Sequence, residues 1–119
     1  MTVKYANSAT TTLLYDITAL ATSLIGRSSD NFPALAVGEH TYLTLSNSMD
    51  TEKEIVKCTA ISGTTFTVVR GQESTTAITF SAGDHVQLRI TAGLIGDAIA
   101  DAVIASTATA VAMAIALGG

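Results

Sequence analysis

The residues of this 119-residue chain that could do chemistry are few and far apart. It has two histidines, His40 and His85, and one cysteine, Cys58. A structural zinc site takes four Cys or His ligands and a disulfide takes two cysteines, so we expect neither. Cys58 alternates with Val56 and Ala60. This spacing predicts a buried structural thiol and not a nucleophile.

Four carboxylates are the remaining candidates for chemistry: Asp50, Glu52, Glu54 and Glu73. General acid–base catalysis needs such a group beside a partner and a reacting substrate. Neither a Gly-x-Ser-x-Gly motif nor a glycine-rich phosphate loop accompanies them. We therefore interpret the four as solvated charges, and the sequence predicts no catalytic, cofactor-binding or metal-binding residue.

Composition argues against several other classes. Hydrophobic residues make up 48% of the chain and charged residues only 13%, which argues against disorder. The net charge is −4 and the six Lys and Arg are dispersed, so no nucleic-acid partner is expected. Residues 102–119 carry no charge, but they are mostly Ala without flanking Lys or Arg, so membrane insertion is not expected. A chain with so few charged residues is expected to bury much of its surface against other protein, most simply against other copies of itself.

The chain divides into two regions that must position any site. Residues 1–90 are rich in Thr, Ser, Val and Ile and predict a small antiparallel β-sandwich or barrel. Residues 91–119 are dominated by Ala and predict a C-terminal helix. Strands are expected over 10–15, 23–26, 42–45, 54–61, 65–70 and 85–90, with a hairpin loop at 62–64. The predicted core is Leu43, Leu45, Val56, Phe66, Val68, Val86, Leu88 and Ile90.

Two segments of the β region resemble each other. Residues 38–45 and 83–90 both begin with Gly, an acidic residue and His, and both continue with large aliphatic residues at alternating positions. One interpretation is a pair of similar strand–loop–strand halves; the other is that Gly-acid turns often precede strands. On either interpretation, His40 and His85 mark equivalent strand starts.

The Ala-rich helix is the predicted self-association element. Thr91 suits the N-cap position, and Asp97 and Asp101 lie toward the positive end of the helix dipole. After Asp101 an isolated helix would expose apolar surface all round, which is typical of a helix packed against copies of itself. The candidate oligomer interface is Leu94, Ile95, Ile99, Val103, Ile104, Val111, Met113, Ile115 and Leu117.

One part of the β region is distinctive. Residues 54–60 are EIVKCTA, residues 62–64 are SGT, residues 66–77 are FTVVRGQESTTA and residues 80–84 are FSAGD. In this order the blocks resemble a module that recurs in tailed-bacteriophage virion proteins, often at the N-terminus of tail fibres. The resemblance covers about residues 8–92 and includes no catalytic residue.

Within this module, Arg70, Gly71, Gln72 and Glu73 form a predicted turn at the end of a strand. Gly71 permits a sharp turn, and the polar side chains can bond the turn's own backbone. Arg70 is expected to pair with Glu73 or to reach another subunit. Ser74 stands where the pattern favours Gly, which questions any need for a positive φ at that position.

The resemblance implies a non-enzymatic structural component of a bacteriophage virion, made in the cytoplasm of a bacterial host. The chain ends after one Ala-rich helix, so we expect an adaptor or short fibre base and not a complete long fibre. It would assemble with itself, three copies being favoured, and with tail or baseplate proteins. The alternative is a head decoration or cement protein that uses the same module on the capsid. An enzyme such as a cell-wall hydrolase, or a membrane protein such as a holin, is not expected.

Overall fold

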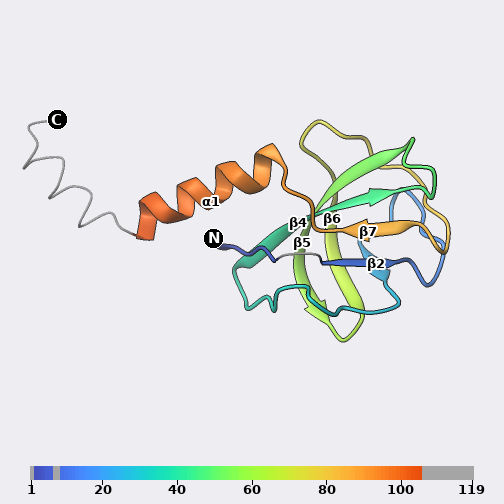
Figure 1. Cartoon of the computed structure of the whole chain (residues 1–119), viewed down its shortest axis with the longest axis horizontal. Coiled ribbons are helices and arrows are strands. Elements are labelled where there is room, and N and C mark those ends of the chain that lie inside the picture. The colour runs from blue at the N-terminus through green and yellow to red at the C-terminus, as the bar shows by residue number, and fades with distance from the viewer. Residues whose placement is uncertain (1, 7–8, 106–119) are drawn as a thin grey trace, which may run out of the picture.

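A curled antiparallel sheet forms a half-barrel, and one helix follows it in the part of the chain described by the computed structural model, residues 2–6 and 9–105 (Figure 1). This confirms the predicted mainly β fold with a C-terminal helix. The strands are β1 (Thr2–Val3), β2 (Thr10–Thr12), β3 (Ser23–Ile25), β4 (Glu39–Ser46), β5 (Lys53–Ser62), β6 (Thr65–Gln72) and β7 (His85–Gln87), and the helix is α1 (Ala92–Ala105).

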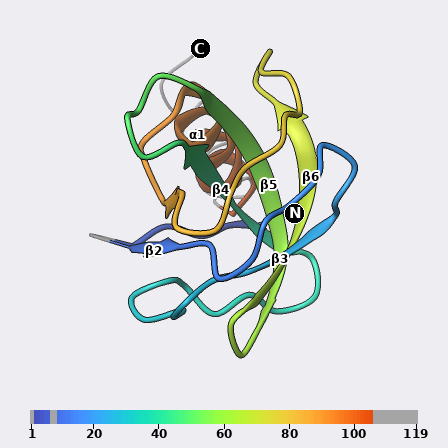
Figure 2. The ribbon, with the colours of Figure 1, turned by 90° about the vertical axis from the view of Figure 1, so that its right-hand side faces the viewer.

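The strand order is β2-β7-β4-β5-β6-β3, with β1 parallel to the start of β4. The two strands at the ends of this order, β2 and β3, come together where each strand ends. Leu14 N donates to Ile25 O and Arg27 N donates to Thr12 O, both at 2.9 Å. The sheet therefore curls back on itself and encloses its inner face (Figure 2).

The sequence predicts a hairpin loop at 62–64, and the structure has a hairpin there whose loop between β5 and β6 is two residues long. Ser62 pairs with Thr65, and Gly63, the first loop residue, has a φ of +59°. A positive φ at this position is the pattern of a type II′ turn, which glycine adopts without strain. The register between these two strands shifts twice along their length, and such bulges increase the bend of a sheet.

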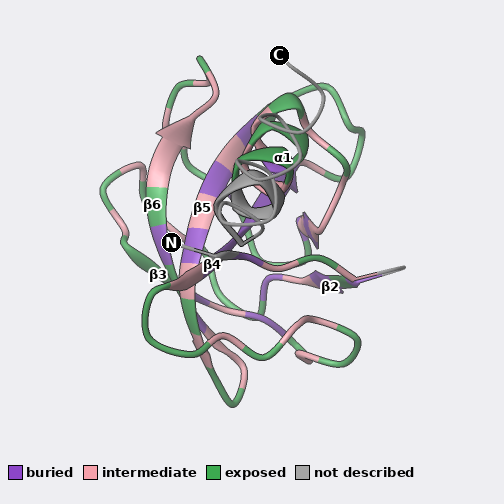
Figure 3. Cartoon of the chain, turned by 90° about the vertical axis from the view of Figure 1, so that its left-hand side faces the viewer, coloured by how far each residue is buried: buried purple, intermediate pink, exposed green. Residues whose placement is uncertain are grey.

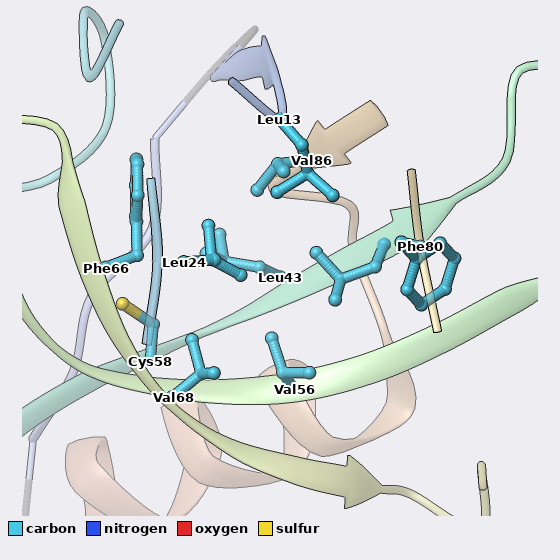
Figure 4. Packing of buried hydrophobic residues seen from close by; sticks show 10 residues of the cluster. Leu13, Leu24, Leu43, Val56, Cys58, Phe66, Val68, Phe80 and Val86 are labelled. Atoms are coloured by element: carbon cyan, nitrogen blue, oxygen red, sulfur yellow. The ribbon is translucent and has the colours of Figure 1, made fainter. Parts of the chain in front are cut away.

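The core fills the inner face of the curled sheet (Figure 4). Six of the predicted core residues are buried there, as is Cys58, whose pKa is raised to about 11 by burial. The prediction is wrong for Ile90, which is 79% exposed because β7 ends at Gln87 and its alternation stops there. The core cluster consists of Leu13, Leu24, Leu43, Leu45, Val56, Cys58, Phe66, Val68, Phe80 and Val86, and Leu88 packs against it while half-buried.

The two similar segments begin with equivalent turns, at residues 36–39 and 81–84. The third residue of each turn, Gly38 or Gly83, has a φ of +86° or +93°. In the first turn, the Glu39 amide donates to the Ala36 carbonyl at 3.0 Å, and the Glu39 carboxylate accepts from the Ala36 amide at 2.7 Å. In the second turn, Asp84 and Ser81 make the same two hydrogen bonds, at 3.0 and 2.8 Å. The sequence similarity thus corresponds to one turn used twice.

Candidate functional site

Glu54 and Arg70 form a buried ion pair on the inner face of the sheet. Glu54 is fully buried and the Arg70 side chain is 7% exposed. Arg70 Nε donates to Glu54 Oε2 at 2.7 Å and Nη2 donates to Oε1 at 2.8 Å. Burial alone would raise the pKa of Glu54, but the hydrogen bonds from Arg70, Ile78 N and Gly71 N hold it below its usual value. The interpretation of Glu54 as a solvated charge is therefore wrong.

The Arg70 guanidinium also connects two chain segments to the sheet. It donates to the carbonyls of Thr18 at 2.6 Å, Ala21 at 3.1 Å and Ile78 at 2.5 Å. The carboxylate that Arg70 pairs with is that of Glu54, so the expectation of a pair with Glu73 is wrong. Arg70 instead fixes the segment between β2 and β3 and the one between β6 and β7.

Glu73 caps helix α1 (Ala92–Ala105) and is not the solvated charge that the sequence predicts. Its Oε1 accepts from Gly93 N at 2.7 Å, and its Oε2 accepts from the Thr91 hydroxyl at 2.6 Å. Thr91 Oγ1 accepts in turn from Leu94 N at 3.1 Å, which confirms Thr91 as the N-cap. A Cβ on Gly93 would lie 2.6 Å from Glu73 Cδ, so any larger residue there would force the capping carboxylate to shift.

The rest of the motif turn is held by its own polar groups, as predicted. The Thr75 hydroxyl donates to Gln72 O at 2.6 Å and accepts from Ile55 N at 3.0 Å. The Gln72 side chain donates to a carbonyl of the same turn at 3.1 Å. Gly71 has a φ of +61° and Ser74 one of +67°. The turn thus keeps a positive φ at Ser74 even though a serine occupies the position.

A polar cluster of His40, Tyr42 and Asp97, which we call the latch, joins α1 to the outer face of β4. His40 Nε2 lies 2.7 Å from Asp97 Oδ2, and the Tyr42 hydroxyl donates to the same oxygen at 2.8 Å. His40 and Tyr42 are buried, at 2% and 8% exposure. His85, the counterpart of His40, is half-buried in β7, so only one of the two histidines contacts the helix.

The latch changes the acidity of its members. Burial raises the pKa of Tyr42 to about 12, and the hydrogen bond and charge of Asp97 add to this effect. Burial would raise the pKa of Asp97, but the hydrogen bonds from Tyr42 and His40 outweigh it and lower that pKa. Asp97 is therefore ionised at neutral pH, and its Oδ2 is held by two hydrogen bonds from its own chain.

One face of α1 packs on the sheet and another is open to solvent (Figure 3). Leu94 is buried against Val3 and Tyr42 of its own chain. Ile95 and Ile99 are 49% and 61% exposed. Of the other predicted interface residues, Val103 and Ile104 belong to α1, while Val111, Met113, Ile115 and Leu117 lie outside the described residues.

An apolar groove of about 230 Å³ lies between α1, the segment that precedes it and the N-terminal segment after β1. None of the described residues that line it carries a charged side chain. Tyr5 and Ile90 on its walls are 67% and 79% exposed. The lining residues are Tyr5, Ala6, Leu88, Ile90, Leu94, Ile95 and Ala98. Sequence reasoning missed the N-terminal wall, because an isolated Tyr in a short segment carries no periodic signal.

The remaining candidate residues lie on the surface. Asp50 and Glu52 are exposed, as predicted, and Asp50 pairs with Lys53 at 3.3 Å and Arg89 at 3.2 Å. Within residues 2–6 and 9–105, no three His, Cys, Asp or Glu side chains are grouped so as to hold a metal ion. Over the same ranges no helix combines the length and hydrophobicity needed to cross a membrane.

Neither the protein-family models nor the curated proteins contain a match to this chain. The described surface includes an apolar region formed by the groove together with the exposed Ile95 and Ile99 of α1.

Proposed function

We propose that this chain is a non-enzymatic structural component of a bacteriophage virion, an adaptor or short fibre base of the tail. It assembles with itself through α1 and the surface beside it, with three copies favoured. Its other partners are tail or baseplate proteins. The proposal combines the resemblance of residues 8–92 to virion modules with the way the motif residues are used in this fold.

The observation that carries the proposal is that the motif residues place the helix. Glu54 and Arg70 fix the end of the β5–β6 hairpin from inside the sheet. Glu73, three residues after Arg70, caps α1 from the turn that follows. Glu54, Arg70 and Glu73 all make hydrogen bonds that position other parts of the same chain. This use of the motif suits a module that presents a helix. It also leaves none of these three side chains available for catalysis.

The exposed apolar surface supports self-association. Ile90, Ile95 and Ile99 are each about half exposed or more. Burying one such side chain is worth roughly 1.5–3 kcal/mol, so three of them are a considerable driving force for association. Residues 102–119 contain no charged residue, and this composition also favours association.

The decisive experiment locates the protein in particles. Virions of the phage that encodes the chain are purified and separated into heads and tails, and the chain is quantified in each by mass spectrometry. We expect it in tails, at a low copy number that is a multiple of three. Recovery with heads at a copy number near that of the capsid subunits would identify the decoration protein instead. Absence from virions would refute both.

A further inference from the structure

We propose that α1 is a releasable arm, which leaves the outer face of the sheet as one unit while the half-barrel stays folded. The docked helix is then one of two states of this chain, and the latch sets the balance between them. The inference does not depend on the virion role proposed above, because it concerns contacts within a single chain.

The two faces of the sheet carry hydrophobic clusters of different size. Among the described residues, the inner cluster has ten buried members, and none of them comes from α1. The outer cluster has three buried members, Val3, Tyr42 and Leu94, of which Leu94 belongs to the helix. Hydrophobic stabilisation grows with the apolar area removed from water. The half-barrel therefore keeps its main core when α1 leaves, whereas the outer cluster is lost.

The first two turns of α1 make the contacts with the sheet. Leu94 is buried and Asp97 is half-buried there, whereas Ile99 is exposed and the helix leads away from the sheet (Figure 1). Gly93 and Gly96 fall in the same two turns, and glycine is a poor helix former. The helical state of this part of the chain therefore depends on its contacts with the sheet more than on its own propensity.

A short connection gives the arm its pivot. Leu88 N donates to Ala9 O at 2.9 Å, and among the described residues this is the last backbone hydrogen bond to the sheet before the helix. The Arg89 side chain is fixed by hydrogen bonds to two residues of the half-barrel. Ile90 follows and is 79% exposed. Rotation at Ile90 and Thr91 can therefore move α1 without breaking the pairing of β7.

The docked state contains two unfavourable features that release removes. His40 Nδ1 is buried and bonds none of the described residues, so it regains hydration when the helix leaves. Glu73 and Ser74 have φ values of +52° and +67°, and such residues persist where neighbouring contacts hold them. For Glu73 those contacts are its bonds to Thr91 and to Gly93 N of the helix. These costs bring the docked and released states closer in free energy.

The latch is the contact best placed to set this balance. His40 Nε2 and the Tyr42 hydroxyl lie 2.7 and 2.8 Å from the same atom, Asp97 Oδ2. Hydrogen bonds to an ionised group are stronger than those between neutral groups. One carboxylate on the helix thus makes both polar contacts with β4, and its loss opens them together.

Native-state hydrogen exchange of the full-length chain, followed residue by residue by NMR, tests the release. The amides of residues 95–99 should have protection factors at least about a hundredfold below those of the paired amides of β4 and β5, with little dependence on low urea concentrations. Several protein concentrations are compared, so that protection from self-association is recognised. Equal protection and equal urea dependence in helix and sheet would indicate one cooperative unit and overturn the inference. Helix amides as unprotected as those of a free peptide would show that α1 does not dock, with the same consequence.

Variants of the latch test its part in the balance. Asp97→Asn should lower the protection of residues 95–99 by about tenfold or more while the β4 and β5 amides keep theirs, because it removes the ionised acceptor. Asp30→Asn, which removes the same charge from an exposed side chain in the β3–β4 connection, is the matched control and should change neither. Tyr42→Phe keeps the ring, loses one of the two hydrogen bonds and should have a smaller effect in the same direction. Helix protection unchanged in both latch variants, or helix and sheet protection lowered equally, would overturn the inference.

Discussion

Replacing Arg70 with Met removes the positive charge from the inner face of the sheet and keeps much of the side-chain volume. Glu54 would stay fully buried and lose two of its four hydrogen bonds. Three carbonyls would also lose a hydrogen bond from the guanidinium. Breaking one side of a buried ion pair costs about 3–5 kcal/mol. At roughly 4–8 °C per kcal/mol, the Tm should fall by at least about 12 °C.

The pH dependence of this loss identifies its cause. In the wild type the folded-state pKa of Glu54 is lowered. Its contribution to stability is therefore present above the unfolded-state pKa of about 4.3 and is lost as the pH falls through the lower folded value. Without Arg70, burial prevails and raises the folded-state pKa. The difference in unfolding free energy between wild type and Arg70→Met should then be largest near neutral pH and shrink as the pH falls toward about 4.

Urea denaturation followed by circular dichroism measures both effects. The matched control is Arg89→Met, which breaks an ion pair with Asp50 that is 34% and 50% exposed, and should cost about 1 kcal/mol or less. The double variant Glu54→Leu/Arg70→Met should be at least as stable as Arg70→Met, because it leaves no unpaired charge. The reasoning fails if Arg70→Met is no less stable than Arg89→Met, or if its deficit does not change with pH.

Three further predictions follow from the local geometry. Gly93→Ala should lower the helix content of the CD spectrum because its Cβ would displace the Glu73 cap, whereas Gly96→Ala, with nothing within 4 Å of its Cβ, should stabilise α1 by about 1 kcal/mol; equal effects would contradict the cap. Ser74→Gly should raise the unfolding free energy by roughly 0.5–1 kcal/mol by relieving a φ of +67°, and a lower Tm would show that the serine is not strained. Cys58, with its pKa raised to about 11, should react with a thiol reagent at pH 8 only at the rate of global unfolding, and rapid reaction in the folded state would show that the core is open.

Much of the β region could be predicted because its signals are local. Alternation of side chains indicates the long strands, and Gly63 indicates the hairpin loop between β5 and β6. Thr91 was predictable as an N-cap because capping depends on residues a few positions apart. Phe80 was missed because it joins the core from an irregular segment that has no period. Leu13 lies within the strand expected over 10–15, but the core prediction omitted it.

The buried ion pair was predictable in part. Glu54 alternates with Val56, and Arg70 alternates with Val68, so both charges fall on the faces predicted to be buried. Two opposite charges on the core faces of adjacent strands are a signal for an internal pair. The residue type of Glu54 by itself indicates a solvated charge, whereas its position in the strand indicates burial.

The sequence by itself determined the division into a β region and an Ala-rich helix, since hydrophobic period and residue propensity act over a few neighbouring positions. Only the tertiary structure decided which face of α1 is covered. His40 and Asp97 are 57 residues apart in the chain, and their contact depends on where the whole sheet carries β4. The groove likewise joins segments from both ends of the described chain, and no local pattern encodes that proximity.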